Sequence, residues 1–187
     1  MMLFLKKTED VVLSLNVEGM ILRWHWDASF AVHPDCKSHT GGTLTMGKGC
    51  ILSSSKKQKL NTRSSTEAEL VAVDDGMGLM LWSKLFLEAQ GHVVEDNVLY
   101  QDNKSAILLE KNGKASSSKR TRHLNIRCFF ATDQVSKGNL RVEHCPTDQM
   151  IADCFTKPTT GAKFWYLWKL IMNPEGRCED TGESQDE

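Results

Sequence analysis

The feature that most constrains the fold is the stretch Ser64–Leu70, which predicts the start of the longest helix in the chain. A hydroxyl side chain here can cap the helix by accepting a hydrogen bond from a free N–H of the first turn. Glu67 and Glu69 follow, where the positive end of the helix dipole favours carboxylates. Apolar residues then recur in steps of three and four, which predicts a helix from about residue 65 to about residue 90 with one buried face. A capped amphipathic helix explains this stretch; the alternative is that one glutamate faces a site.

Strand patterns lie on both sides of this helix. Residues 21–32, 41–46 and 50–54 predict three successive antiparallel strands. Residues 98–101 and 140–145 predict two more strands. Because a helix separates the fourth strand from the first three, we expect this strand to pair in parallel through a crossover. The sequence therefore predicts an α/β fold.

Two features of the core segments bear on packing. Gly76 and Gly78 lie inside the predicted helix, where each lowers helix propensity by about 1 kcal/mol relative to alanine. We therefore expect close packing or a kink at these positions. The triplet Trp24-His25-Trp26 is unusually bulky for a strand, and we expect it to crowd the sheet.

Composition is that of an ordinary globular protein. The 187 residues suit one domain, with 40% hydrophobic and 25% charged residues and a net charge of −1 that does not by itself indicate a nucleic-acid binder. Residues 175–187 carry six acidic residues and one arginine without apolar periodicity, so we predict a disordered acidic tail. The six cysteines form no C-x-x-C pair, and the sequence shows neither a signal peptide nor an apolar run of about 20 residues. We therefore expect an intracellular protein that does not span a membrane.

Carboxylates recur at the ends of the predicted elements. Asp27 lies in the first strand, where a buried carboxylate is costly unless it is paired or binds a metal. Glu69 lies in the long helix, Asp102 ends the fourth strand, and Asp153 lies in a late helix. If the four converge at one sheet edge, they can bind two Mg²⁺ ions, because hard cations prefer oxygen ligands. The alternative is chance placement, since the chain has 24 acidic residues.

Six ordered segments carry a resemblance to a known family. They are Asp27–Gly42, Ser53–Lys59, Ser64–Leu70, Tyr100–Ile107, Ser118–Arg127 and Cys145–Pro158. Together, over roughly residues 3–173, the chain resembles the ribonuclease H domain of Ty1/copia-type retrotransposon Pol polyproteins.

The resemblance implies a fold and an activity. The implied fold is RNase H-like, with a five-stranded mixed sheet of order 3-2-1-4-5 flanked by helices. The implied activity is endonucleolytic hydrolysis of the RNA strand of RNA–DNA hybrids by a two-metal-ion mechanism, with Mg²⁺ as the cofactor and Mn²⁺ as a substitute. It also implies that Asp27, Glu69, Asp102 and Asp153 are the catalytic and metal-binding residues. The implied partners are an RNA–DNA hybrid and the reverse transcriptase domain of the same polyprotein, in cytoplasmic virus-like particles or in the nucleus.

The choice between the two glutamates of the long helix follows from geometry and from the resemblance. Glu67 and Glu69 are separated by about 200° around a helix, so both cannot face one site. The resemblance favours Glu69, whose register matches the helical carboxylate of the superfamily. We expect Glu67 to be a surface acid that complements the helix dipole.

The resemblance also suggests a division of the chain. We expect residues 1–20 to be a remnant of the connection to an upstream polymerase, because the chain begins in the middle of a pattern. Residues 21–158 form the predicted RNase H-like domain, 159–173 a C-terminal helix, and 174–187 the acidic tail.

Two basic clusters are candidates for contacts to the phosphates of a nucleic acid. They contain Lys56, Lys57, Lys59, Arg120, Arg122 and His123. The alternative for both clusters is a solvated surface without a ligand.

Some positions depart from the family pattern. Ser29 stands where a second acid is frequent, and His144 differs in position from a histidine that related enzymes use for product release. Two other functions therefore stay open. One is an inactive or domesticated fragment that binds nucleic acid or a protein without cleavage, and the other is an integrase-like strand-transfer enzyme, which the Ser64–Leu70 and 152–158 segments disfavour.

Overall fold

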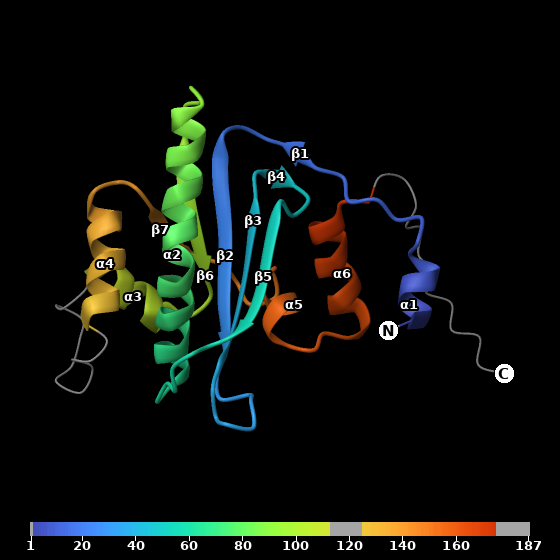
Figure 1. The fold of residues 1–187 in the computed structure, drawn as a ribbon, viewed down its shortest axis with the longest axis horizontal. Helices are drawn as coiled ribbons and strands as arrows, with labels where there is room; N and C mark the ends of the chain where they lie inside the picture. The colour runs from blue at the N-terminus through green and yellow to red at the C-terminus, as the bar shows by residue number, and fades with distance from the viewer. Residues whose placement is uncertain (1, 113–124, 175–187) are drawn as a thin grey trace.

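The structure is a computed structural model, which describes residues 2–112 and 125–174. Its centre is a five-stranded mixed sheet with the spatial order β5-β3-β2-β6-β7 (Figure 1). The strands are β2 (Ile21–Ser29), β3 (His39–Thr45), β5 (Leu52–Lys57), β6 (Asp96–Gln101) and β7 (Arg141–His144). When these five strands are counted along the chain, the order is 3-2-1-4-5, so the predicted fold and strand order are confirmed.

The pairing directions agree with the predicted crossover. Strand β3 pairs antiparallel with both β2 and β5, whereas β6 pairs parallel with β2 and with β7. Parallel neighbours end at the same edge of a sheet. The carboxyl ends of β2 and β6 therefore lie next to each other.

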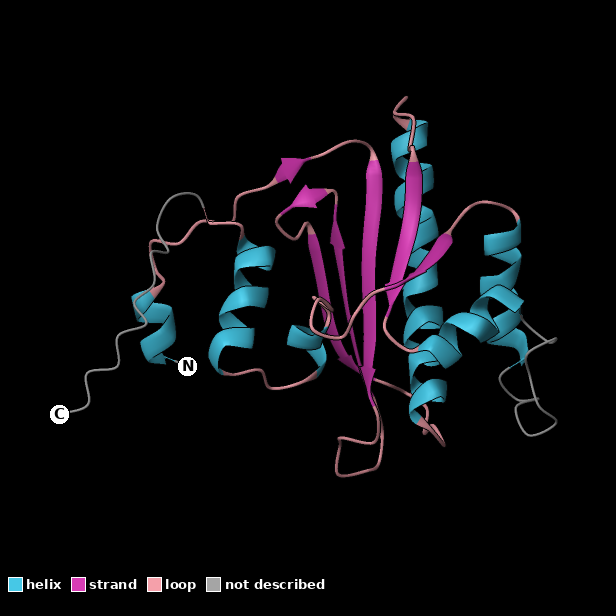
Figure 2. Cartoon of the chain, turned by 180° about the vertical axis from the view of Figure 1, so that it is seen from behind, coloured by secondary structure: helices cyan, strands magenta, loops and turns pink. Residues whose placement is uncertain are grey.

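Helices cover the two faces of the sheet. Helix α2 (Ser65–Ala89) packs against β2 and β3, and α3 (Lys104–Asn112) and α4 (Asn125–Ser136) lie beside it (Figure 1). Seen from behind, the sheet stands in front of α2 (Figure 2). The short helix α5 (Asp153–Thr156) contacts β3, and α6 (Gly161–Met172) follows it. The late predicted helix is thus only one turn long.

The N-terminal residues lie along α6. Helix α1 (Met2–Lys7) places the ring of Phe4 at 5.6 Å from that of Phe164. The two-residue strand β1 (Asn16–Val17) pairs with β4 (Gly47–Lys48). The predicted division of the chain at residues 20 and 158 stays a prediction, and the predicted acidic tail lies outside the described residues, apart from Pro174.

The main core lies between the sheet and α2. Trp24 and Trp26 are 0% and 1% exposed, and two glycines, Gly42 and Gly76, make room for the ring of Trp26. A Cβ at Gly42 would lie 2.6 Å from this ring, and one at Gly76 would overlap it. The close packing expected at Gly76 is therefore confirmed, and it resolves the crowding expected from the tryptophans.

Gly78 differs from Gly76, because a Cβ there would meet no heavy atom within 4 Å. Among the helices of residues 2–112 and 125–174, none combines the length and the hydrophobicity that a membrane crossing requires.

Candidate active site

The start of α2 is fixed by a reciprocal pair of hydrogen bonds. Ser64 is the N-cap, and its hydroxyl accepts a hydrogen bond from the N–H of Glu67 at 3.2 Å. The Glu67 carboxylate in turn accepts one from the N–H of Arg63 at 2.7 Å. This is a capping box, which satisfies two backbone donors that a helix start leaves free. Glu67 serves the helix start as expected, but it is only 8% exposed, so the prediction of a surface position is wrong.

Three of the four predicted ligands converge. Asp27 comes from β2, Asp102 follows β6 directly, and Glu69 comes from the second turn of α2. One carboxylate oxygen from each residue lies within 4.8 Å of the others. Asp27 and Glu69 are buried, at 1% and 5% exposure, and Asp102 is half-buried. The parallel pairing of β2 and β6 brings the two aspartates together, and the cap of α2 sets the position of Glu69.

These carboxylates lack sufficient compensating charge. Burial, together with the neighbouring Asp27 and Asp102, raises the pKa of Glu69 to about 9. Within the described residues, Oε2 of Glu69 has no hydrogen-bond partner. Burial also raises the pKa of Asp27, although the Thr156 hydroxyl, which donates to Asp27 Oδ2, and Lys157 partly offset this effect. A buried carboxylate without a partner is costly, and a divalent cation would remove that cost.

The fourth predicted ligand, Asp153, lies outside the group of three carboxylates and is held by two lysines. Lys157 Nζ lies 2.7 Å from Asp153 Oδ1, and Lys163 Nζ lies 2.5 Å from Asp153 Oδ2. The same Lys157 ammonium is 3.2 Å from Asp27 Oδ2. Burial by itself would raise the pKa of Asp153, but hydrogen bonds from both lysines hold it below its ordinary value.

The approach of α5 to the sheet depends on a glycine. Gly41 lies opposite Asp27 in the register of β2 and β3. A Cβ at this position would lie 2.9 Å from Cβ of Phe155 and 3.0 Å from the carbonyl oxygen of Ala152. Only a glycine lets α5 come close enough for Thr156 and Lys157 to reach Asp27.

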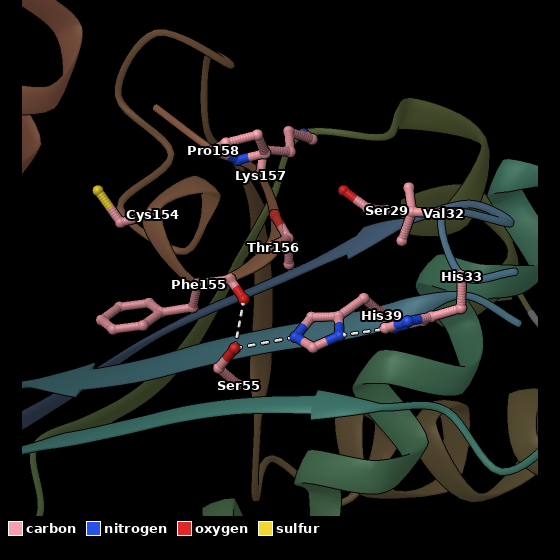
Figure 3. A pocket seen from close by; sticks show the side chains of 10 residues that line it. All are labelled: Ser29, Val32, His33, His39, Ser55, Cys154, Phe155, Thr156, Lys157 and Pro158. Carbon is pink, nitrogen blue, oxygen red and sulfur yellow. Dashed lines mark hydrogen bonds between the residues drawn. The ribbon is translucent and has the colours of Figure 1, made fainter. Parts of the chain in front are cut away.

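A pocket of about 370 Å³ opens beside Thr156 and Lys157, and Ser29 lies in its wall (Figure 3). A chain of hydrogen bonds crosses it. The Ser55 hydroxyl donates to the carbonyl of Phe155 at 2.8 Å, so its oxygen accepts from Nε2 of His39 at 2.8 Å. His39 Nδ1 is then an acceptor, and His33 Nε2 donates to it at 3.0 Å. The directions follow from the carbonyl at the end of the chain, which can only accept. The chain ties the loop after β2 to the backbone of α5.

Sequence reasoning did not assign roles to Thr156, Lys157 and Lys163. Lys157 follows Asp153 by four residues, which on a helix places two side chains on one face. That spacing is a signal that could have identified the Lys157–Asp153 pair. Lys163 has no such local signal, because it reaches Asp153 from a different helix.

The predicted nucleic-acid contacts fall into two groups. Lys56, Lys57 and Lys59 are exposed. Lys56 and Lys57 alternate along β5 and reach different acids, Asp75 at 4.0 Å and Asp35 at 2.7 Å. Their role in binding stays a prediction. The other three predicted contacts lie outside the described residues: Arg120, Arg122 and His123.

His144 ends β7, where it pairs in register with Gln101, the residue before Asp102. It is exposed, as expected for a histidine at a strand end. The structure thus places it near the carboxylate edge.

The chain is similar to segments of known proteins, although no family model matches it. It is 33% identical over 169 residues to the retrovirus-related Pol polyprotein from transposon TNT 1-94 of Nicotiana tabacum, covering 90% of this chain and 13% of that protein. It is 37% identical over 140 residues to the Pol polyprotein from transposon RE1 of Arabidopsis thaliana, covering 74% of this chain. The Ty1-NL2 Gag-Pol polyprotein of Saccharomyces cerevisiae is 30% identical over 154 residues.

Solved structures show the same fold. LC11-RNase H1, determined in complex with an RNA/DNA hybrid, matches with a TM-score of 0.52 at 14% identity over 72% of this chain and 92% of that one. The N-terminal RNase H domain of a Mycobacterium tuberculosis protein matches with a TM-score of 0.51 at 14% identity over 73% and 90%. The chain spans only 13%, 9% and 8% of the lengths of the three Pol polyproteins. It therefore belongs to the family of Ty1/copia-type retrotransposon Pol polyproteins, of which it corresponds to one segment, and this segment has the RNase H-like fold.

Proposed function

We propose that the chain hydrolyses the RNA strand of RNA–DNA hybrids, as the ribonuclease H part of a Ty1/copia-type Pol polyprotein. The observation that carries this proposal is the convergence of Asp27, Glu69 and Asp102 within 4.8 Å, with Glu69 Oε2 buried and unpartnered among the described residues. The fold and the family of the relatives support it. LC11-RNase H1, which shares the fold, was solved with an RNA/DNA hybrid bound, and this favours the same substrate class here.

The residues fit divalent metal ions. The donors are all carboxylate oxygens, which Mg²⁺ and Mn²⁺ prefer. Because three carboxylates lie close together, a cation would stabilise their charged forms. Asp27, Glu69, Asp102 and Asp153 would hold the two ions. When bound, the ions supply activation of a water molecule and stabilisation of the leaving oxygen in a phosphoryl displacement.

The chain's own residues position this centre. The capping box fixes the first turn of α2, so Glu69 keeps its orientation toward Asp27. The Thr156 hydroxyl orients the Asp27 carboxylate by donating to Oδ2. Such prior ordering reduces the rearrangement that binding and reaction require. The exposed lysines of β5 are the proposed contacts to the phosphates of the hybrid. The proposed partner in the parent element is the reverse transcriptase domain, in virus-like particles or in the nucleus.

Cleavage of a labelled hybrid tests the proposal. The purified chain is incubated with an RNA–DNA hybrid and either Mg²⁺ or Mn²⁺, beside Asp27→Asn and the control variant Asp133→Asn, which changes a carboxylate of α4 that pairs with Lys137. We expect cleavage of the RNA strand only, with a loss of about three orders of magnitude or more in Asp27→Asn. Cleavage that survives in Asp27→Asn, or cleavage absent from every sample, would contradict the proposal.

A second candidate is a fragment that binds nucleic acid without cleaving it. The observation that favours it is the neutralisation of Asp153 by two lysines. It predicts that the wild-type chain retains a hybrid in a mobility-shift assay and yields no RNA products with either ion.

A further inference from the structure

The two sides of the carboxylate cluster differ in charge compensation. On one side, each oxygen of Asp153 contacts a different ammonium group, at 2.7 Å from Lys157 and 2.5 Å from Lys163. On the other side, Oε2 of Glu69 has no hydrogen-bond partner among the described residues. Positive charge is therefore concentrated on the Asp153 side.

Lys157 is the residue that joins the two sides. Its ammonium lies 3.2 Å from Asp27 Oδ2 and 2.7 Å from Asp153 Oδ1, so it stands between these two carboxylates. Lys157 also follows α5 directly, and its side chain is 42% exposed. A divalent ion shared by Asp27 and Asp153 would need ligand oxygens at about 2.0–2.1 Å in the case of Mg²⁺. The ammonium and such an ion cannot occupy that position together.

We propose that Lys157 is a built-in competitor for one of the two metal ions. This inference rests on the proposed function, because it assumes that the carboxylates bind two ions. The first ion binds among Asp27, Glu69 and Asp102 without displacing a lysine. The second ion binds between Asp27 and Asp153 only when the Lys157 ammonium withdraws.

The competition gives Lys157 a role in the absence of metal. Without a positive charge between them, the buried Asp27 and Asp153 would repel each other, and Lys163 would compensate Asp153 only, which is unfavourable. Lys157 supplies that charge and holds α5 against β2. Lys163 differs, because its ammonium contacts Asp153 and the carbonyl oxygen of Thr147 but forms no ion pair with Asp27 among the described residues. We therefore expect the removal of Lys157, rather than of Lys163, to act on the affinity for the second ion.

Mn²⁺ binding to the full chain tests the competition without any substrate. Free Mn²⁺ is counted by electron paramagnetic resonance during titration of the wild type, Lys157→Gln and the control Lys137→Gln. The control removes one positive charge from an exposed i,i+4 pair at the end of α4. We expect two ions of unequal affinity in the wild type. In Lys157→Gln the dissociation constant of the second ion should fall about tenfold or more, while that of the first changes less than about threefold. Lys137→Gln should match the wild type in both constants.

If the dissociation constant of the second Mn²⁺ ion is unchanged or larger in Lys157→Gln, the inference is overturned. If Lys157→Gln does not fold, as judged by circular dichroism, the wild type is titrated with Mg²⁺ while the lysine ammonium signals are followed by ¹⁵N NMR. The signal of Lys157, assigned by its loss in Lys157→Arg, should then move with the second equivalent of Mg²⁺. A signal that moves with the first equivalent, or does not move, would refute the competition.

The inference and the proposed function fail separately. If the chain cleaves the hybrid but Lys157→Gln binds the second ion no more tightly than the wild type, only the inference is overturned. If Lys157→Gln binds the second ion more tightly but the wild type does not cleave, the inference is supported and the proposed function is contradicted.

Discussion

Two buried glutamates, Glu69 on α2 and Glu110 on α3, are similar in burial but differ in their neighbours. Both lie on helices and are 5% and 0% exposed. Burial is the main cause that raises the pKa of Glu69 to about 9 and that of Glu110 to about 8. Each has at least one carboxylate oxygen without a hydrogen-bond partner in the described part of the chain. Only Glu69, however, lies within 4.8 Å of two other carboxylates.

Burial alone does not make a glutamate functional. A perturbed pKa marks a candidate for a functional site, but an isolated buried acid is perturbed as well. Among the described residues, no carboxylate neighbour raises the pKa of Glu110, and the nearby Lys111 lowers it. The convergence of several oxygen donors is therefore the property that distinguishes a candidate metal site from an unfavourable buried charge.

The largest expected difference between the two glutamates is in catalysis. Glu69→Gln should lower the rate of hybrid cleavage by about three orders of magnitude, because it removes a charged ligand from the site. Glu110→Gln should keep the rate within about threefold, because Glu110 is absent from the cluster. Rates are measured under single-turnover conditions with the same labelled hybrid. Equal losses in both variants would break the comparison.

The next effect is a stability difference that depends on pH. The pKa of folded Glu110, about 8, lies above its ordinary value of 4.5, so the folded state binds the proton more tightly. The stability linked to this proton is full below about pH 4.5 and is lost as the pH rises toward 8. Glu110→Gln should therefore raise the free energy of unfolding at pH 8 by on the order of 4 kcal/mol.

Urea unfolding at pH 5 and pH 8 measures this effect. Glu88→Gln is the matched control, because Glu88 is an exposed acid of α2 that lies 4.0 Å from Lys84. The control should show no gain at pH 8. If Glu110→Gln loses stability at both pH values, the carboxylate has a favourable role in the fold, which would contradict its description as an acid without a partner in residues 2–112 and 125–174.

A third prediction concerns the packing that holds the Glu69 helix. Gly76→Ala should destabilise the protein by about 1–3 kcal/mol, because the added methyl group overlaps the buried ring of Trp26. Gly78→Ala should stabilise it by up to about 1 kcal/mol, since that position opens to space and alanine favours a helix. Urea unfolding of the pair gives the comparison. Equal effects of the two substitutions would show that α2 does not depend on contact with Trp26.

The smallest effect is expected at the helix cap. Ser64→Ala should cost about 1 kcal/mol, because it removes the acceptor for the N–H of Glu67. Ser65→Ala is the control, since Ser65 is the first helical residue and is exposed. Thermal unfolding measures the loss of stability in each variant. An equal loss in Ser65→Ala and Ser64→Ala would contradict the role of Ser64 as the N-cap.

Local signals in the sequence predicted the fold well. The predicted helix from about 65 to 90 corresponds to Ser65–Ala89, because its cap, its apolar steps and the terminal Gly91 with a φ of 88° all act locally. The five strands are present, and their order agrees with the resemblance. The predicted late helix is present but short, since only Asp153–Thr156 forms a helix before the chain turns.

The site was predictable only in part. Asp27, Glu69 and Asp102 could be expected to meet, because strand ends and a helix start determine their positions. The partners of Asp153 depend on how α6 packs, so the contact with Lys163 had no local signal. The burial of Glu67 and Glu110 could likewise not be predicted from the sequence, because an acid on a helix usually faces solvent. Tertiary packing determines both the contact of Lys163 and the burial of these glutamates.

The most direct test of the central claim is the position of Mn²⁺ in crystals of the full chain soaked with the ion. Anomalous differences locate the metal independently of activity. We expect a peak bounded by Asp27, Glu69 and Asp102, and none beside Glu110. Absence of a peak at the three carboxylates, or a peak at Glu110 instead, would contradict the assignment of a metal centre to this edge of the sheet.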